Sequence, residues 1–320
     1  MNIAVIGTGH LGTIHARLWA QQEGVTLASI VDPDETKGRA VAAEHGAAWY
    51  PSLEAMPDVD AVTIAAPTSL HHRLALDVLE RGMHCFIEKP ITATHTEALD
   101  VLAAAERVGR VVQVGHVERF NPAVRALAHV DVQPLFIEAH RLAPFKPRAI
   151  DVSVVHDLMI HDIDLILWLT GSEVTKVDAT GVAVLTDTPD ICNARITFAN
   201  GCVANLTASR ITAKPMRKMR VFQRDSYISL DLAAPGLELY RLIDGTALDP
   251  SHQIPLGTLS TQHGDRMIVF DTPPVPPVNA IAEEQRAFLD SITHGADIAV
   301  TAREATEAVR IAELIDRMTS

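Results

Sequence analysis

The glycine-rich segment GTGHLG at residues 7–12 limits what this chain can fold into more than any other feature. It follows a short apolar run typical of a strand, and a helical pattern covers 10–22. Gly7 allows a tight turn, Gly9 lets the backbone approach a pyrophosphate, and Gly12 lets helix and strand pack closely. The free N–H groups and partial positive charge at a helix N-terminus then favour phosphates. Because a strand and a helix flank it on the required sides, the segment predicts a dinucleotide-binding turn.

The first 120 residues continue this alternation of apolar runs and helical patterns. The apolar runs cover 2–7, 26–32, 61–67, 84–90 and 111–116, and the helical patterns cover 10–22, 34–45, 70–81 and 94–108. Near-continuous β-branched runs between amphipathic helices indicate a parallel sheet with helices on both faces. We therefore expect a doubly wound α/β dinucleotide-binding domain over residues 1–120.

Asp32 ends the second apolar run, twenty residues beyond Gly12. A carboxylate at this position accepts hydrogen bonds from both hydroxyls of an adenosine ribose and repels a 2′-phosphate. The sequence therefore favours NAD over NADP as the cofactor. Lys37 and Arg39 lie close enough to Asp32 in the sequence to keep NADP open.

Length and charge narrow the remaining possibilities. With 320 residues the chain is long for one hydrophobic core, which favours two domains. Its formal net charge is −13 without any basic block, which argues against nucleic acid and anionic membranes as partners. No stretch stays apolar for the roughly 18 residues that a membrane span needs. Without a signal sequence before the first strand, we expect a cytoplasmic protein.

Three cysteines are expected to be buried apolar residues, because they lack the spacing of metal ligands. They are Cys85, Cys192 and Cys202.

After residue 120 the alternation of strands and helices stops. Strand patterns follow one another at 133–143, 173–186, 190–199, 202–211, 216–223 and 226–232, and helical patterns cover 153–170, 280–293 and 301–318. Several of the strands are joined by short turns, which link antiparallel neighbours. We therefore expect a second domain over 121–320 that contains an antiparallel sheet. Gly171 is expected to end the first of these helices.

That helix begins with HDLMIHDID at 156–164, and its ionisable residues divide by direction. At about 100° per residue, Asp157, His161 and Asp164 fall within about 60° of one another. The rest of the helix is apolar nearly all round, so we expect it to be buried, where a carboxylate and an imidazole need partners or a polar cleft. His156 and His161 diverge by about 140° and cannot face one ion, so no metal site is expected. A catalytic pair and a structural role stay open.

Five segments together resemble the Gfo/Idh/MocA oxidoreductases: GTGHLG, APTSLHH, GMHCFIEKP, QVGHVERFNPAV and DLMIHDID. Their order and spacing cover both halves of the chain. The resemblance implies a Rossmann domain followed by an α/β domain on a large, mostly antiparallel sheet. It also implies NAD(P)-dependent oxidation or reduction at a carbinol or carbonyl carbon, usually of a sugar or cyclitol.

Carried over residue by residue, the resemblance assigns the active site to Lys89, Asp157 and His161. Lys89 would stabilise the developing alkoxide. His161 would take the proton of the substrate hydroxyl, which suits an imidazole because its unperturbed pKa is about 6.5. Asp157 would orient the imidazole or bind a neighbouring hydroxyl, and which of Lys89 and His161 accepts the proton stays open. Cofactor contacts are expected from Gly7, Thr8, Gly9, His10, Leu11, Gly12, Asp32, Pro67, Thr68, His71, Glu88, Lys89 and Gln113.

Local cations in a chain of negative net charge suit an anionic ligand such as a nucleotide diphosphate. Substrate contacts are expected from Lys89, His116, Arg119, Asn121, Lys146, Arg148, Asp157 and His161. HVERFNPAV and HDLMIHDIDLIL also resemble the subgroup of the family that oxidises the 3-hydroxyl of UDP-N-acetylglucosamine. In that subgroup an aminotransferase takes the 3-keto product towards a 3-amino sugar of lipid A.

Two alternatives stay open. One is a dehydrogenase of a free sugar or cyclitol. The other is a non-catalytic NAD-dependent sensor, which the joint presence of Lys89, Asp157 and His161 disfavours. A sheet face without covering helices would expose apolar area, so a homodimer or homotetramer is also expected, in line with the resemblance.

Overall fold

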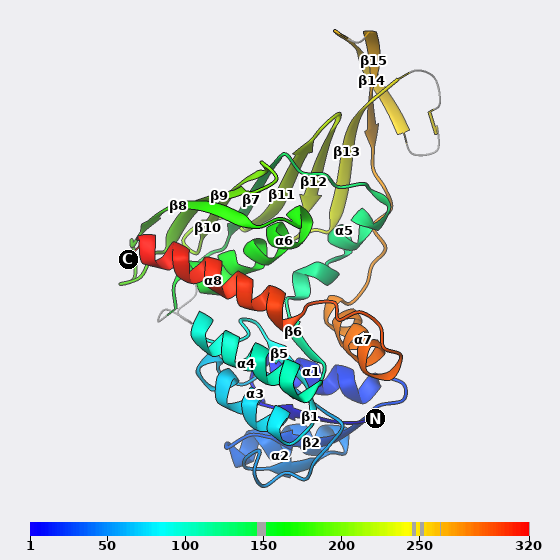
Figure 1. Ribbon diagram of the computed structural model, residues 1–320. Helices are drawn as coiled ribbons and strands as arrows, with labels where there is room; N and C mark the ends of the chain where they lie inside the picture. Colours follow the sequence, from blue (N-terminus) through cyan, green and yellow to red (C-terminus); the bar gives the residue numbers. More distant parts are fainter. Residues whose placement is uncertain (146–151, 245–247, 250–252, 263, 320) are drawn as a thin grey trace. The chain divides into compact units, whose positions relative to one another are not determined.

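The computed structural model describes residues 1–145, 152–244, 248–249, 253–262 and 264–319. The chain divides into two units, and most of their helices and strands are labelled in Figure 1. The first unit combines Met1–Val117 with Asn279–Arg310, and the second combines Glu118–Val278 with Ile311–Ser320. The sequence placed a boundary at 120 and gave no sign that a late segment of the chain joins the first unit.

The first unit is built on a parallel sheet. Its strands are β1 (Asn2–Ile6), β2 (Thr26–Val31), β3 (Ala48–Tyr50), β4 (Ala61–Ile64), β5 (His84–Glu88) and β6 (Val112–Gly115). They lie in the order β3-β2-β1-β4-β5-β6, and every neighbouring pair is parallel. The strand order reverses between β1 and β4, where doubly wound folds bind their ligands beyond the carboxyl ends of the strands. The predicted doubly wound sheet is confirmed, although the short β3 was not predicted.

Four helices connect these strands, each within one residue of its predicted range. They are α1 (His10–Gln21), α2 (Glu35–His45), α3 (His71–Glu80), which follows the 3₁₀ turn η1 (Thr68–Leu70), and α4 (His95–Val108). Local sequence explains their ends. Thr94 and Glu97 form a capping box at the start of α4, and Gly109 ends that helix with a φ of 60°.

Helix α7 (Ala280–Thr293) belongs to the first unit although it comes late in the chain. Its Phe288 ring lies 6.4 Å from that of Trp19 in α1 and 5.7 Å from that of Phe86 in β5, measured between centroids. All three side chains are fully buried. Edge-to-face aromatic packing of this kind adds to the stabilisation from burial, so α7 completes the hydrophobic core of the first unit.

The second unit is built on a large sheet. Its strands are β7 (Phe136–Leu142), β8 (Val174–Val182), β9 (Ile191–Phe198), β10 (Val203–Ser209), β11 (Met216–Gln223), β12 (Ser226–Asp231), β13 (Gly236–Ile243), β14 (Gln253–Thr261) and β15 (Gly264–Asp271). Among the described residues their order is β14-β15-β13-β12-β11-β7-β10-β9-β8, and only β7 and β10 pair in parallel. The predicted, mostly antiparallel sheet is confirmed. Strands β13 to β15 were missed; β14 is exposed along most of its length and shows no alternation of apolar and polar residues.

Short helical turns and two longer helices accompany this sheet. They are η2 (Val117–Phe120), α5 (Pro122–Arg125), η3 (Ala126–His129), η4 (Val155–Met159), α6 (Ile160–Thr170) and the end of α8 (Ala302–Thr319). The helix expected over 153–170 therefore has two parts, because η4 is a π-helical turn. An angle of about 100° per residue describes α6 but not this wider turn. Gly171 ends α6 as predicted, with a φ of 56°.

Three further observations concern the described ranges as a whole. No helix in them has the length and apolarity that crossing a bilayer requires. No group of three or more His, Cys, Asp or Glu side chains in them is placed to hold a metal ion. The three cysteines are fully buried, as expected.

Candidate active site

The glycine turn between β1 and α1 leaves its backbone open on one side. Gly7 has a φ of +95°, and a Cβ there would lie 2.7 Å from the carbonyl oxygen of Ala65. A Cβ at Gly12 would lie 1.9 Å from the carbonyl oxygen of Gly7, so both positions require glycine. A Cβ at Gly9 meets nothing within 4 Å, and Gly9 caps α1 without a side-chain hydrogen bond. The free helix N-terminus and the open space at Gly9 fit a pyrophosphate.

The carboxylate of Asp32, directly after β2, is bound to this turn. Its Oδ2 accepts hydrogen bonds from the backbone N–H of Thr8 at 2.7 Å and from the Thr8 hydroxyl at 2.6 Å. Its Oδ1 accepts one from the N–H of Asp34 at 2.8 Å. A carboxylate oxygen has two acceptor sites, so the hydrogen bond from Asp34 leaves Oδ1 the capacity to accept a ribose hydroxyl. His10 and Leu11 begin α1 with exposed side chains beside the same turn.

Pro67, Thr68 and His71 follow β4 at the carboxyl edge of the parallel sheet. Pro67 is exposed and Thr68 is half-buried, whereas His71 is 1% exposed. The two ring nitrogens of His71 each lie 2.9 Å from a backbone carbonyl oxygen, Nε2 from that of Ala66 and Nδ1 from that of Pro90. The ring therefore links the turns that follow β4 and β5, and its contact with the cofactor stays a prediction.

The glutamate of the EKP segment, at the end of β5, is held from two sides. Oε1 of Glu88 lies 2.7 Å from Nε2 of His15 in α1, and Oε2 accepts the N–H of Lys89 at 3.1 Å. Gln285 of α7 donates its amide to Nδ1 of His15 at 3.0 Å, so the ring presents an Nε2–H to the carboxylate. The Lys89–Pro90 peptide bond is cis. His15 and Gln285 were not predicted, because a single histidine or glutamine within an amphipathic helix carries no distinguishing signal.

Gln113 and His116 lie in and directly after β6. Gln113 is fully buried, and its side-chain amide donates to the carbonyl oxygen of Glu284 at 2.8 Å. His116 is 1% exposed, and its backbone N–H donates to the carbonyl oxygen of Val114 at 2.8 Å. Gln113 thus joins β6 to α7. Its contact with the cofactor and that of His116 with the substrate stay predictions.

Asp157 and His161 lie in the second unit, on η4 and at the start of α6. Both residues are half-buried, which sets them apart from the fully buried apolar positions Met159 and Ile160 between them. The backbone N–H of Asp157 donates to the carbonyl oxygen of Ser153 at 3.0 Å. A half-buried carboxylate and imidazole retain access to a polar ligand while the helix backbone holds them in place.

The neighbouring ionisable residues of HDLMIHDID contact other ionisable side chains within the second unit. Asp162 accepts hydrogen bonds from Arg141 of β7 at 2.8 and 3.0 Å, and Arg141 also donates to Glu118 at 2.8 Å. Burial raises the pKa of Asp162, and the guanidinium of Arg141 only partly offsets that rise. Nε2 of His156 lies 3.1 Å from Oδ2 of Asp316 in α8. These contacts fix the helix that carries Asp157 and His161.

Arg119 and Asn121, both predicted substrate ligands, also have protein partners. Nε and Nη2 of Arg119 donate to the two carboxylate oxygens of Asp164 at 2.9 and 2.6 Å. The side-chain amide of Asn121 donates to the carbonyl oxygen of Leu232 at 3.0 Å. Asp164 therefore serves an ion pair that the sequence did not predict, and substrate binding by Arg119 and Asn121 stays a prediction. The two remaining predicted ligands lie outside the described residues: Lys146 and Arg148.

Comparison with known proteins adds to this geometry. A model described as an oxidoreductase family with an NAD-binding Rossmann fold matches residues 1–116, and one for the GFO/IDH/MocA C-terminal domain matches residues 102–228. The UDP-N-acetylglucosamine 3-dehydrogenase of Acidithiobacillus ferrooxidans is 43% identical over 248 residues, which cover 77% of this chain and 79% of that protein. The chain belongs to the Gfo/Idh/MocA family. The predicted NAD cofactor and oxidoreductase class are confirmed with it.

A solved structure of that enzyme and one other family member extend the comparison. A solved structure of the Acidithiobacillus ferrooxidans enzyme superposes with a TM-score of 0.89 at 37% identity, covering 100% of this chain and 97% of that one. Inositol 2-dehydrogenase 4 of Saccharopolyspora erythraea is 34% identical over 193 residues, or 55% of this chain and 56% of that protein. Family relatives therefore include enzymes named for a nucleotide sugar and for a cyclitol.

Proposed function

We propose that this protein uses NAD to oxidise the 3-hydroxyl of UDP-N-acetylglucosamine to a ketone. The observation that carries the proposal is the similarity to UDP-N-acetylglucosamine 3-dehydrogenase, which extends over three quarters of the sequence and over the whole fold. The open glycine turn and the carboxylate of Asp32 support NAD as the partner of the reaction.

The chemistry assigns one task to each of three side chains. NAD supplies the acceptor for the hydride that leaves carbon 3 of the sugar. His161 accepts the proton of the 3-hydroxyl, and the ammonium group of Lys89 stabilises the negative charge that develops on the same oxygen. Asp157 orients the imidazole of His161 or binds a neighbouring hydroxyl. Loss of the C–H hydride and the O–H proton leaves the 3-ketone.

A substrate panel tests the assignment. The protein is mixed with NAD and either UDP-N-acetylglucosamine, other UDP-sugars, free sugars or inositols, and absorbance at 340 nm is followed. We expect NADH to form with UDP-N-acetylglucosamine. Turnover of free polyols alone would overturn the nucleotide-sugar assignment.

Substitution of Lys89 and His161 tests the proposed roles. We expect Lys89→Ala and His161→Ala each to lower kcat by about 100-fold or more, the usual contribution of an acid–base or charge-stabilising group. NADH binding, followed by fluorescence titration, should be preserved. A His161→Ala enzyme with an unchanged kcat would refute proton transfer to His161.

Oxidation of a cyclitol is the second candidate function, because several similar proteins are named inositol 2-dehydrogenases. Each of these covers only about half of the chain, whereas the UDP-sugar enzyme covers 77%. The same panel distinguishes the two, since only one substrate class carries a nucleotide.

A row of aromatic rings on the second unit supports self-association. The rings lie across five neighbouring strands with centroids 4.9 to 5.9 Å apart, and each ring has at least one apolar sequence neighbour that is buried. The row consists of Phe136, Phe222, Tyr227, Tyr240 and Phe270. We propose that a second copy covers this face in a homodimer or homotetramer. Sedimentation of Phe222→Glu as a smaller species than wild type would support this, and identical sedimentation would contradict it.

We further propose that an aminotransferase consumes the 3-keto product.

A further inference from the structure

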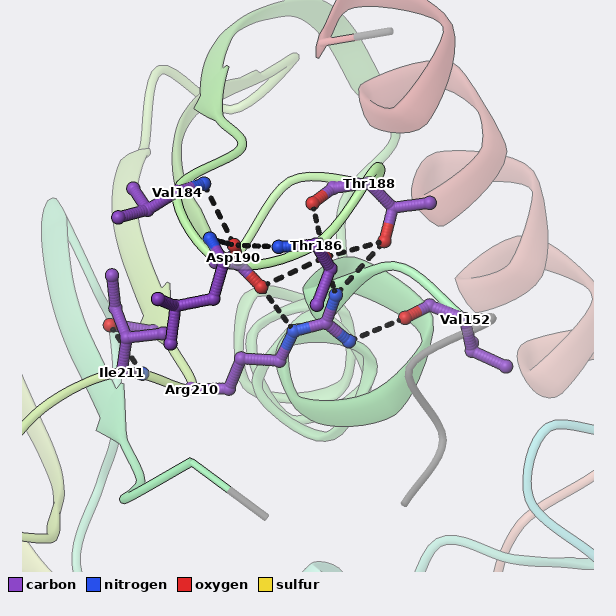
Figure 2. A network of polar contacts seen from close by, with 9 residues as sticks. Val152, Val184, Thr186, Thr188, Asp190, Arg210 and Ile211 are labelled. Atoms are coloured by element: carbon purple, nitrogen blue, oxygen red, sulfur yellow. Dashed lines mark hydrogen bonds and ion pairs between the residues drawn. The ribbon is translucent and has the colours of Figure 1, made fainter. Parts of the chain in front are cut away.

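Arg210 directly follows β10, and its guanidinium joins the end of this strand to two other segments of the second unit (Figure 2). Nε donates to Oδ1 of Asp190 at 2.8 Å. Nη2 donates to the hydroxyls of Thr186 and Thr188 at 2.8 and 2.9 Å, and Nη1 donates to the carbonyl oxygen of Val152 at 2.7 Å. The residue is 6% exposed, so these are strong bonds from a desolvated cation.

Asp190 makes the loop between β8 and β9 a fixed support for this cation. Its Oδ2 accepts hydrogen bonds from the backbone N–H groups of Val184, Leu185 and Thr186 at 2.8, 2.6 and 3.1 Å. Burial would raise the pKa of Asp190, but the hydrogen bonds from these backbone groups and from Arg210 outweigh it and hold the pKa well below the ordinary carboxyl value. Arg210 therefore faces an ionised carboxylate that is itself held by the loop backbone.

The hydrogen bond to Val152 fixes the chain where it enters the helix that carries Asp157 and His161. The loop between β8 and β9 also binds Val154, two residues further on, because the N–H of Val154 donates to the carbonyl oxygen of Pro189 at 3.2 Å. Val154 is fully buried. Two backbone contacts, at Val152 and Val154, thus set the position of the chain just before the π-helical turn.

Asp316 of helix α8 binds the same stretch of chain at the start of the helix that carries Asp157 and His161. The hydroxyl of Ser153 donates to the carboxylate of Asp316 at 2.7 and 2.9 Å, and Nε2 of His156 lies 3.1 Å from it. Ser153 lies between Val152 and Val154, and its side chain is therefore fixed by α8 and not by the loop between β8 and β9. This leaves little freedom for the backbone before Asp157.

We propose that Arg210 is a positioning residue for Asp157 and His161, a role that rests on the proposed function of those two side chains. Only a planar fork with several donors can bond a carboxylate, two hydroxyls and a carbonyl oxygen at once. Loss of the bond to Val152 would let the helix entry shift, and misplacement of a reacting group by about 1 Å can cost about 100-fold in rate.

Arg210→Lys tests the proposal, with Thr188→Val as its matched control. Lysine keeps the charge but cannot reach Asp190 and Val152 together, whereas Thr188→Val removes one loop contact and keeps the bond to Val152. We expect Arg210→Lys to lower kcat by about 10- to 100-fold and to leave NADH affinity unchanged. Hydrogen exchange should rise in a peptide spanning 153–161 in this variant. Both quantities should stay at the wild-type level in Thr188→Val.

Chemical rescue separates positioning from general loss of stability. Guanidinium ion at a concentration below the unfolding range should restore part of the kcat of Arg210→Ala and lower exchange in the same peptide. An unchanged kcat or unchanged exchange in Arg210→Lys would overturn the proposal, as would equal effects of Arg210→Lys and Thr188→Val. If wild type oxidises no substrate of the panel, the proposed function fails by itself, and the exchange data alone decide whether Arg210 holds the helix.

Discussion

Nε2 of His15 lies 2.7 Å from Oε1 of Glu88, with the imidazole fully buried and the carboxylate side chain 10% exposed. The contact joins α1, which follows the glycine turn, to the end of β5, where the other carboxylate oxygen accepts the N–H of Lys89. One hydrogen bond therefore couples the turn that fits a pyrophosphate to the segment that carries the proposed catalytic lysine, within a single unit.

Replacing His15 with leucine removes the donor and leaves a carboxylate oxygen buried. We expect the free energy of unfolding to fall by about 1–3 kcal/mol, the usual cost of an unsatisfied buried polar group. Urea unfolding at neutral pH measures the change. His294→Leu, at a side chain that is 76% exposed, is the control and should stay within about 0.5 kcal/mol of wild type. Equal stability of His15→Leu and wild type would show that the pair does not hold the two elements together.

Alanine at Gly9 and at Gly12 should have opposite consequences. A Cβ at Gly9 meets nothing within 4 Å, so Gly9→Ala should fold with an unchanged melting temperature and bind NADH more weakly, because the methyl group occupies the space for the pyrophosphate. A Cβ at Gly12 would lie 1.9 Å from the carbonyl oxygen of Gly7, so Gly12→Ala should lose stability before any ligand is added. Thermal unfolding and fluorescence titration measure the two effects. Unweakened NADH binding by Gly9→Ala would contradict a pyrophosphate at this turn.

The backbone architecture could be predicted because its signals are local. Runs of β-branched residues predicted most of the parallel strands of the first unit. The helical pattern over 280–293 predicted α7 at its observed bounds. Strand β14 shows the limit of this reasoning, since its side chains are exposed and carry no alternation. The π-helical turn over Val155–Met159 was missed for a related reason, because an apolar helix gives the same pattern in either geometry.

The polar contacts of the candidate site could not be predicted, because their partners lie far apart in the sequence. His15 and Glu88 are separated by 73 positions, and Arg210 and Val152 by 58. The motifs predicted Glu88 as a site residue, but the position of the histidine that binds its carboxylate depends on how α1 packs in the fold. Arg119 illustrates the converse: its charge suggested an anionic ligand, whereas the fold also gives it the buried carboxylate of Asp164.

Asp32 should set the preference for NAD over NADP. Asp32→Ser removes the carboxylate that repels a 2′-phosphate, and we expect the ratio of kcat/KM for NADP to that for NAD to rise by about tenfold, the equivalent of about 1.4 kcal/mol. Initial rates with each cofactor at saturating sugar measure it. Asp34→Ser removes a nearby carboxylate that caps α2 and should leave the ratio unchanged. An unchanged ratio in Asp32→Ser would exclude ribose recognition by this side chain.

The pair between Arg119 and Asp164 should contribute strongly to the stability of the second unit. Their side chains are 5% and 1% exposed, and Arg119→Met leaves a buried carboxylate without the guanidinium. We expect a loss of about 3–5 kcal/mol in the free energy of unfolding, and a smaller loss in Arg119→Met/Asp164→Leu, because the double variant buries no charge. Urea unfolding of wild type, Arg119→Met, the single variant Asp164→Leu and the double variant completes the cycle. Additive losses would show that the two side chains act independently, and a raised KM for the sugar in the folded double variant would support Arg119 as a substrate ligand.

His84 should make the stability of the first unit depend on pH. At the start of β5 its Nδ1 accepts the N–H of Val111 at 3.0 Å, which requires the neutral ring. Burial and the charge of Arg110 lower the pKa of His84, and Asp60 opposes them only in part. The unfolded chain, with an ordinary pKa of about 6.5, therefore binds a proton more readily than the folded protein. The contribution of His84 to stability is complete above that pH and is lost as the pH falls through the lowered pKa of the folded state.

Glutamine at position 84 keeps an acceptor for the N–H of Val111 and does not titrate. We expect the free energy of unfolding of wild type to fall more steeply than that of His84→Gln as the pH is lowered from about 7 to about 5, because only wild type has to protonate this ring. Urea titrations at a series of pH values measure both slopes. His294→Gln, at an exposed side chain, should follow the wild-type slope. Parallel slopes for wild type and His84→Gln would mean that the folded protein binds a proton at His84 as readily as the unfolded chain does.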